Sequence, residues 1–224
     1  MKKFLFMIIL INLLIGCAKF ASFGETTNAE RQDCQTPAQC SDLGFAYLNG
    51  HGVEENYTLA KKLFSYACTA GEMHGCNNLG LVYQRGLGVK TNYEKAFDLF
   101  QTACQGGNIL GCNNLGTMYE RGLGVIQNFE QAVNLYRNAC DQADMLACNN
   151  LGFMYEQGQG VSQNFTKAIE LYRKSCGADI LDGCMVLGAM YLHGQGVEKD
   201  LDQADRFLRK ACQLGSKSSC RAVE

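Results

Sequence analysis

The sequence has little histidine and lacks the closely spaced cysteines that hold zinc or haem. Its three histidines, His51, His74 and His193, are far apart, and none of its 13 cysteines forms a C-x-x-C motif with another. Protein zinc sites are usually built from such closely spaced Cys and His ligands. We therefore expect no metal and no other cofactor.

Two further absences narrow the class of protein. Lys and Arg are scattered and the formal net charge is −2, so there is no basic stripe of the kind that binds nucleic acid. No segment alternates apolar and polar residues over the length of a strand between turn signals. Hydrophobic residues make up 47% of the chain, which is enough for a folded core. The sequence thus predicts a folded, all-α protein that does not bind nucleic acid.

The apolar run at the start of the chain is short. Lys2 and Lys3 precede about 13 mostly apolar residues at positions 4–16, fewer than the roughly 20 that span a membrane, and this layout predicts a secretory signal. The run ends in Leu-Ile-Gly-Cys at 14–17, which resembles the bacterial lipoprotein box, where the cysteine is lipidated. Ordinary cleavage that discards Cys17 is the alternative. Either route predicts an extracytoplasmic protein, a periplasmic lipoprotein or a secreted one.

The rest of the chain is repetitive. CNNLG occurs at 76–80, 112–116 and 148–152, and CSDLG at 40–44 and CMVLG at 184–188 fall on the same spacing of 36 residues. Gly-x-Gly-Val recurs on that spacing at 50–53, 86–89, 122–125, 158–161 and 194–197. A fixed period of this size is typical of a repeat array. We divide the chain into a signal peptide (1–17), a linker (18–33) and one repeat domain (34–224) with five units over roughly 38–214.

Each unit is predicted to form two helices. Cys76, Leu79 and Tyr83 share one face of the first helix, which the Gly-x-Gly ends because glycine adopts the left-handed conformation of a C-cap. Asn92 or Asn128 can cap the second helix, whose buried stripe is predicted at Tyr93, Ala96 and Phe100, and at Phe129, Ala132 and Tyr136 in the next unit. A glycine inside the first helix predicts close approach by a neighbouring helix. It recurs at Gly44, Gly80, Gly116, Gly152 and Gly188.

The cysteines other than Cys17 fall into six close couples. In five of them seven residues lie between the two cysteines, and in the first couple five do. Each couple spans the corner between the second helix of one unit and the first helix of the next. A disulfide there would join adjacent units and contribute about 2–3 kcal/mol in the chain-entropy model. The couples are Cys34 with Cys40, Cys68 with Cys76, Cys104 with Cys112, Cys140 with Cys148, Cys176 with Cys184, and Cys212 with Cys220.

These motifs resemble the SLR (Sel-one-like repeat) family, which is related to tetratricopeptide repeats. The cysteine couples are similar to those of its Helicobacter cysteine-rich protein branch, although the first couple departs from the family spacing. The resemblance covers about 34–224. It implies an alpha/alpha superhelical solenoid of helix pairs, with the first helices on the concave side. Branch members are commonly classed as penicillin-binding proteins or weak β-lactamases, and some are secreted factors that meet host cells.

The sequence carries no recognisable lactamase machinery. S-x-x-K, S-D-N and K-T-G are absent, and three dispersed histidines supply no metal cluster for hydrolysis. The catalytic residues of any such enzyme stay unassigned. Hydrolysis of β-lactam amides is therefore an alternative that rests on the family resemblance alone.

The asparagines of CNNLG suggest a binding surface. Asn78 shares a strip with Leu81 and Arg85, because i+3 and i+7 lie on one helix face. In tetratricopeptide domains the position aligned with Asn78 often contacts bound peptide. We therefore predict that a peptide, a partner protein or a cell-wall fragment binds in the concave groove, with β-lactams as the alternative ligands and with membrane contact only through the lipid anchor. The predicted ligand-binding residues are Asn78, Asn114, Asn150, Arg85 and Arg121.

A structural role is the competing interpretation of the asparagines, as caps of helix starts or as partners of neighbouring loops. We favour ligand binding for the second asparagine of each pair, at Asn78, Asn114 and Asn150. For the first asparagine of each pair we favour the structural role. These residues are Asn77, Asn113 and Asn149.

Overall fold

The computed structural model describes residues 34–223. The predicted signal peptide, Cys17 and the linker lie outside the described residues. The chain divides into two compact units, Met1–Gln35 and Thr36–Glu224, and every described helix belongs to the second. Within residues 34–223 all regular secondary structure is helical, which confirms the predicted fold class.

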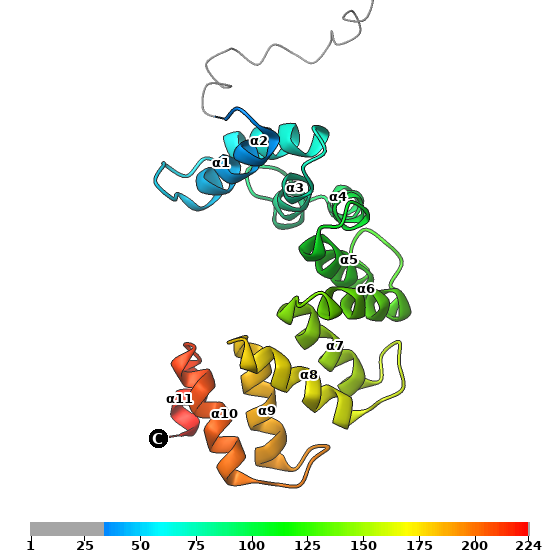
Figure 1. Ribbon diagram of the computed structural model, residues 1–224, viewed down its shortest axis with the longest axis vertical. Helices are drawn as coiled ribbons and strands as arrows, with labels where there is room; N and C mark the ends of the chain where they lie inside the picture. Colours follow the sequence, from blue (N-terminus) through cyan, green and yellow to red (C-terminus); the bar gives the residue numbers. More distant parts are fainter. Residues whose placement is uncertain (1–33, 224) are drawn as a thin grey trace, which may run out of the picture. The chain divides into compact units, whose positions relative to one another are not determined.

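Eleven helices follow one another in chain order through the second unit (Figure 1). Ten of them pair into five repeats, each with a first and a second helix. The pairs are α1 Pro37–Asn49 with α2 Tyr57–Thr69, α3 Met73–Arg85 with α4 Tyr93–Gln105, α5 Ile109–Arg121 with α6 Phe129–Asp141, α7 Met145–Gln157 with α8 Phe165–Gly177, and α9 Leu181–His193 with α10 Leu201–Gln213. The short α11, Lys217–Ala222, packs on α10 and ends the array.

Caps explain where the helices begin and end. The side chain of Asn92 accepts a hydrogen bond from the Lys95 backbone N–H at the start of α4, and Asn128 does the same for α6. This satisfies a backbone donor that a helix start leaves unpaired. Each first helix ends at a glycine in the left-handed region, such as Gly86 with φ of 70°. Both predicted capping devices are confirmed.

The glycine inside each first helix marks the contact with the second helix of the same repeat. A Cβ atom placed on Gly80 would lie 2.6 Å from Cε1 of Phe100, and one on Gly116 would lie 2.7 Å from Cε1 of Tyr136. Both rings are fully buried, so neither could move aside. The predicted close approach is confirmed. In both of these repeats the aromatic ring of the second helix packs directly against the backbone of the first helix at the glycine.

The core is a series of local clusters rather than one centre. Ala96 and Phe100 of α4 pack with Leu115 and Met118 of α5, so the cluster joins two successive repeats. Such nearest-neighbour burial is the usual way that repeat arrays are stabilised.

One predicted core position is wrong. Tyr93 is 41% exposed, whereas Ala96 and Phe100 of the same predicted stripe are fully buried. Tyr93 is the first residue of α4, where the loop of the next repeat passes close to its backbone. A Cβ on Gly124 would lie 2.4 Å from the Tyr93 carbonyl carbon. The ring of Tyr93 stays at the surface although the loop backbone passes close by.

The predicted disulfides are confirmed. Five couples are bonded across the corners between successive second and first helices, from Cys68–Cys76 to Cys212–Cys220. Cys34 and Cys40, the couple with the shorter spacing, are disulfide-bonded as well. Every junction in the array therefore carries a covalent link between two helices that also pack against each other.

Candidate functional site

The first helices form a surface of their own. Besides packing on its second helix, α3 contacts both α1 and α5, the first helices of the neighbouring repeats. Four positions of each first helix, the second, sixth, ninth and thirteenth, lie on one helix face that is not buried against other helices. We call this surface on the three central repeats the first-helix strip. Its residues are His74, Asn78, Leu81 and Arg85 of α3, Leu110, Asn114, Thr117 and Arg121 of α5, and Leu146, Asn150, Phe153 and Gln157 of α7.

Large apolar side chains are exposed on the strip. Leu110 is 46% exposed, Leu146 is 48% exposed and Phe153 is 40% exposed. Phe45, which occupies in α1 the position that Phe153 occupies in α7, is 48% exposed. Leu110 and Leu146 line one hollow, and Phe153 lies on the same face of α7 as Leu146. Exposed apolar surface flanked by polar residues is typical of an interaction site. Leu110 and Leu146 were not predicted as binding residues. Each lies four residues before a predicted binding asparagine and therefore on the same helix face.

A hollow of about 450 Å³ deepens the strip at the starts of α5 and α7. Leu110 and Leu146 line it together with Ile180, and His74 and Asp144 add polar atoms at its wall. Asp144 caps α7 through Oδ1, which accepts from two backbone N–H groups, while its buried Oδ2 has no hydrogen-bond partner among the described residues. The hollow suits an apolar side chain of a ligand.

The asparagines of the strip also link successive repeats. Nδ2 of Asn114 donates to Oδ1 of Asn77 at 2.8 Å, and Nδ2 of Asn150 donates to Oδ1 of Asn113 at 2.9 Å. We call these two contacts the asparagine bridges. Asn77 and Asn113 are buried, whereas Asn114 and Asn150 are half-buried. One N–H of each of the Asn114 and Asn150 amides is therefore engaged. Their binding role stays a prediction that would use the acceptor oxygen and the second N–H of each amide.

The first asparagine of each pair does not cap a helix start. Glu72, Asn108 and Asp144 cap α3, α5 and α7 instead. The favoured structural role of Asn77 and Asn113 is met by the bridges to the next repeat. Asn149, the third of the set, has a buried Oδ1 without a hydrogen-bond partner among the described residues. The position that would donate to it is occupied by Val186, because the last repeat has CMVLG in place of CNNLG.

The two predicted arginines lie at one end of the strip. Arg85 and Arg121 are the last residues of α3 and α5 and both are exposed. Neither forms an ion pair or a hydrogen bond with another described residue, so both guanidinium groups are available to a ligand. A cation at the C-terminal end of a helix is also favoured by the helix dipole.

Beside the strip, a tyrosine and a glutamate connect the two helices of a repeat. The Tyr136 hydroxyl donates to Oε2 of Glu120 at 2.5 Å, and Tyr172 donates to Oε2 of Glu156 at 2.6 Å. Burial, together with the charge of the neighbouring glutamate, raises the pKa of both phenols far above its ordinary value. These phenols stay protonated and act as fixed donors, so the pairs position helices rather than exchange protons at neutral pH.

Between residues 34 and 223, no group of three or more His, Cys, Asp or Glu side chains is arranged to hold a metal ion. No helix in that part of the chain is both long and apolar enough to cross a bilayer.

Comparison with known proteins identifies the repeat. The family model for the Sel1 repeat matches five times, at residues 40–72, 74–108, 109–144, 146–179 and 181–216. These matches coincide with the five repeats of the structure. Among curated proteins, nothing matches the chain significantly.

Solved structures of Sel1-type proteins overlay the chain. A protective antigen of uropathogenic Escherichia coli strains, which displays an SLR fold, is 30% identical with a TM-score of 0.72. That match covers 84% of this chain and 40% of the antigen, so the chain spans less than half of its length. A Sel1 repeat protein from Oxalobacter formigenes is 25% identical, with a TM-score of 0.76, and the match covers 84% of this chain and 75% of that one. Helicobacter pylori cysteine rich protein B is 33% identical over 60% of this chain and 96% of its own, with a TM-score of 0.48.

Proposed function

We propose that this chain, which belongs to the Sel1 repeat family, is an extracytoplasmic scaffold. Its first-helix strip binds an extended peptide segment of a partner protein. The single observation that carries the proposal is the group of exposed apolar side chains at Leu110, Leu146 and Phe153, flanked by polar groups. A cell-wall fragment is the alternative ligand for the same strip.

The strip offers an extended peptide both kinds of contact that it needs. Leu110 and Leu146 can pack against side chains of the ligand, and the hollow between them accepts one of these side chains. The Oδ1 atoms of Asn114 and Asn150 can accept from backbone N–H groups of the peptide, while one N–H of each amide donates to the preceding repeat. Because the bridges fix the orientation of both amides, little side-chain entropy is lost when a peptide binds.

The extracytoplasmic location is supported by the disulfides. Bonded cysteine couples at every junction are stable in an oxidising compartment and rare in the cytosol. Lipidation of Cys17 remains a proposal from the sequence, as does membership of the Helicobacter cysteine-rich branch. Penicillin binding and β-lactam hydrolysis gain no support from the comparisons, and no described residue is assigned to them.

The test uses the disulfide-bonded mature protein and two immobilised probes, an array of nine-residue peptides and purified muropeptides. Peptides that bind should lose affinity by about three- to tenfold in Leu146→Ser, because the variant loses the burial of the exposed half of the leucine side chain. Ile126→Ser is the matched control, because Ile126 is 88% exposed in a loop away from the strip.

Equal losses in the two variants would contradict the proposal, and so would peptide binding that Leu146→Ser leaves unchanged. Retention of muropeptides alone, with the same sensitivity to Leu146→Ser, would assign the strip to the cell wall instead. Melting temperatures of both variants show that any loss of binding does not come from unfolding.

A further inference from the structure

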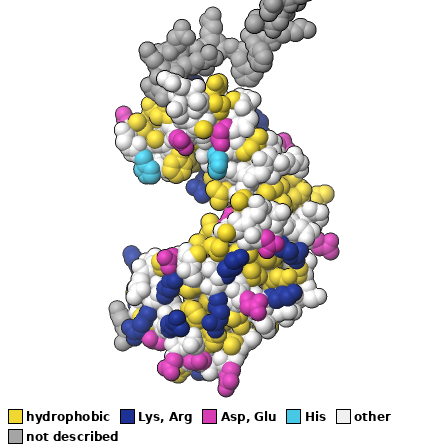
Figure 2. Space-filling model, in the orientation of Figure 1, with side chains coloured by type: hydrophobic (Ala, Val, Ile, Leu, Met, Phe, Trp, Pro, Cys, Tyr) yellow, Lys and Arg dark blue, Asp and Glu magenta, His cyan; other side chains and the backbone are white. Residues whose placement is uncertain are grey.

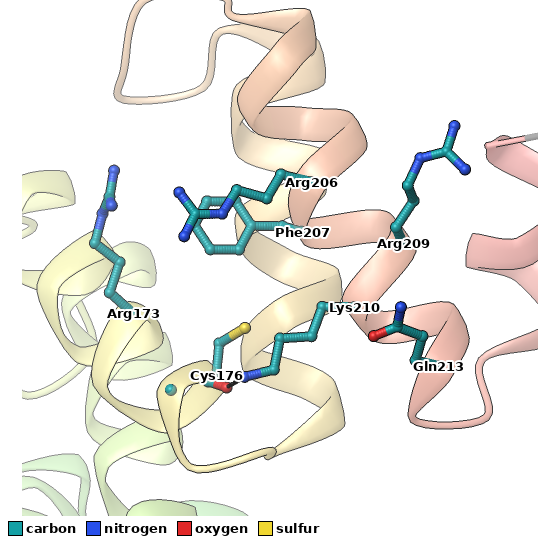
Figure 3. A pocket seen from close by; sticks show the side chains of 8 residues that line it. Arg173, Cys176, Arg206, Phe207, Arg209, Lys210 and Gln213 are labelled. Atoms are coloured by element: carbon teal, nitrogen blue, oxygen red, sulfur yellow. Dashed lines mark hydrogen bonds between the residues drawn. The ribbon is translucent and has the colours of Figure 1, made fainter.

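A second hollow, of about 520 Å³, lies between the second helices α8 and α10, away from the first-helix strip. Four cationic side chains line it, Arg173 from α8 and Arg206, Arg209 and Lys210 from α10, and no lining residue is acidic. Figure 3 shows Arg206 beside the ring of Phe207 on the side of the hollow that faces Arg173. Lys and Arg side chains gather over this part of the molecule in Figure 2.

Two of the four cations are already compensated. Arg209 pairs with Asp205 at 2.6 Å and points away from the other three (Figure 3). Lys210 pairs with Asp179 at 2.9 Å and donates to the Cys176 carbonyl oxygen at 2.6 Å. The charges of Arg173 and Arg206 are left without an acidic partner among the described residues.

These two arginines differ in how firmly they are held. The Arg173 guanidinium lies 5.6 Å from the centres of both the Tyr191 and the Phe207 rings, and it donates to the Tyr191 hydroxyl. Cation–π contacts of this kind orient a guanidinium without neutralising its charge. Arg206 is exposed and makes no hydrogen bond or ion pair with a described residue. One fixed and one free guanidinium therefore face the same hollow.

The repeat itself supplies an internal comparison. One repeat earlier, between α6 and α8, the position of Arg206 is occupied by Glu170 and that of Gly177 by Asp141. Arg173 is matched there by Arg137, which contacts the Tyr155 hydroxyl just as Arg173 contacts that of Tyr191. The earlier junction thus keeps the arginine beside a tyrosine hydroxyl but has carboxylates at two of the equivalent lining positions. The positive hollow is a feature of the last junction and not of the repeat.

We propose that the hollow between α8 and α10 is a binding site for a dianionic group, held by the guanidinium groups of Arg173 and Arg206. Two uncompensated positive charges match a ligand group with two negative charges. Guanidinium forks bind phosphate and carboxylate oxygens in the same way, so the group is a phosphate monoester or two neighbouring carboxylates. The ring of Phe207 forms an apolar wall for the part of the ligand that carries the charge.

The inference is independent of the proposed function, because the strip and the hollow use different helices. The test is an NMR titration of the mature, disulfide-bonded protein with inorganic phosphate and, separately, with succinate. Sodium chloride at matched ionic strength is the control for screening. We expect saturable chemical-shift changes that are confined to α8 and α10. Tighter binding of phosphate would identify a phosphate monoester as the ligand group, and tighter binding of succinate would identify a pair of carboxylates.

Variants make the assignment specific. Arg206→Glu should weaken binding by at least about tenfold, because it removes a charge-assisted hydrogen bond and adds a like charge. Lys90→Glu changes the net charge equally at an exposed loop position and should leave binding unchanged. The pair Asp141→Gly with Glu170→Arg should create a second site between α6 and α8. Shifts that sodium chloride reproduces, binding that survives Arg206→Glu, or no gain in the double variant would overturn the proposal.

Discussion

The junction between repeats 2 and 3 carries an asparagine bridge between its first helices, whereas the junction between repeats 4 and 5 has no such bridge among the described residues and carries a lysine link between its second helices. In the first case Asn114 of α5 donates to Asn77 of α3. In the second, Lys210 of α10 donates to the carbonyl oxygen of Cys176, close to the C-terminal end of α8. A cation placed there also interacts favourably with the helix dipole.

The junction between repeats 3 and 4 has both links. Asn150 donates to Asn113 on the first-helix side, and Lys174 donates to the Cys140 carbonyl oxygen on the other. All of these junctions share a disulfide. The comparison separates two sets of residues. Cysteines, glycines and caps recur because the fold of each repeat needs them, whereas the polar links between repeats differ from one junction to the next.

The largest effect on stability is expected from the disulfides, which all of these junctions have. Replacing Cys140 and Cys148 by alanine should lower the free energy of unfolding by about 2–3 kcal/mol, because the unfolded chain regains the freedom that the bond removes. Both cysteines are buried at the centre of the array, so the whole array should be destabilised. Denaturant unfolding without reductant measures the change.

The same change at the end of the array should act locally. Cys212 and Cys220 join α10 to α11. The main packing partner of α11 among the described helices is α10. Their replacement should speed amide exchange in α11 and leave the exchange of α5 and α6 unaltered. Equal global losses for the two pairs would show that the array unfolds as one unit rather than by neighbouring repeats.

A smaller effect is expected from the asparagine bridges. Asn113→Ala removes the acceptor of Asn150 and should cost about 1–2 kcal/mol, since a half-buried amide loses its partner. Asn149→Ala is the matched control one repeat later, where the buried Oδ1 has no partner to lose. It should be close to neutral. Denaturant unfolding of the two variants measures the change in the free energy of unfolding. Similar losses in both variants would show that the bridges do not stabilise the array.

Much of the fold could be predicted because its determinants are local or lie in the next helix. Three examples are the contact of Gly80 with Phe100, the cap at Asn92 and the disulfide between Cys104 and Cys112. Each depends on residues that are close in sequence, and each motif recurs every 36 residues. The exposed ring of Tyr93 was not predicted, because Tyr93 is the first residue of α4, and helical periodicity does not show whether neighbouring helices cover the end of a stripe.

The site was predicted only in part. Asn78, Asn114 and Asn150 lie on the first-helix face as expected, but which asparagine contacts which depends on the offset between adjacent repeats. The sequence does not give that offset. The bridge therefore joins Asn114 to Asn77 rather than to its own counterpart, Asn78. The hollow between α8 and α10 was not predicted, because Arg206 and Phe207 replace Glu170 and Leu171 of the previous repeat and belong to no recurring motif.

The smallest effect is a gain, and it tests whether a bridge can be moved to the C-terminal region. Val186 stands where the earlier repeats have Asn114 and Asn150, and the Oδ1 atom of Asn149 is buried without a partner among the described residues. Val186→Asn supplies the missing donor at the cost of some apolar contact, because Val186 packs partly buried against the last core cluster. We expect a net stabilisation of about 0.5–1 kcal/mol from the new hydrogen bond. Val186→Ala is the control that loses the same apolar contact without gaining a donor, and it should be destabilising. The gain should vanish when Val186→Asn is combined with Asn149→Ala, and this double-mutant cycle measures the bridge itself. A gain that persists in the double variant would mean that the asparagine stabilises α9 by some other contact, and that the bridges belong to the geometry of the central repeats alone.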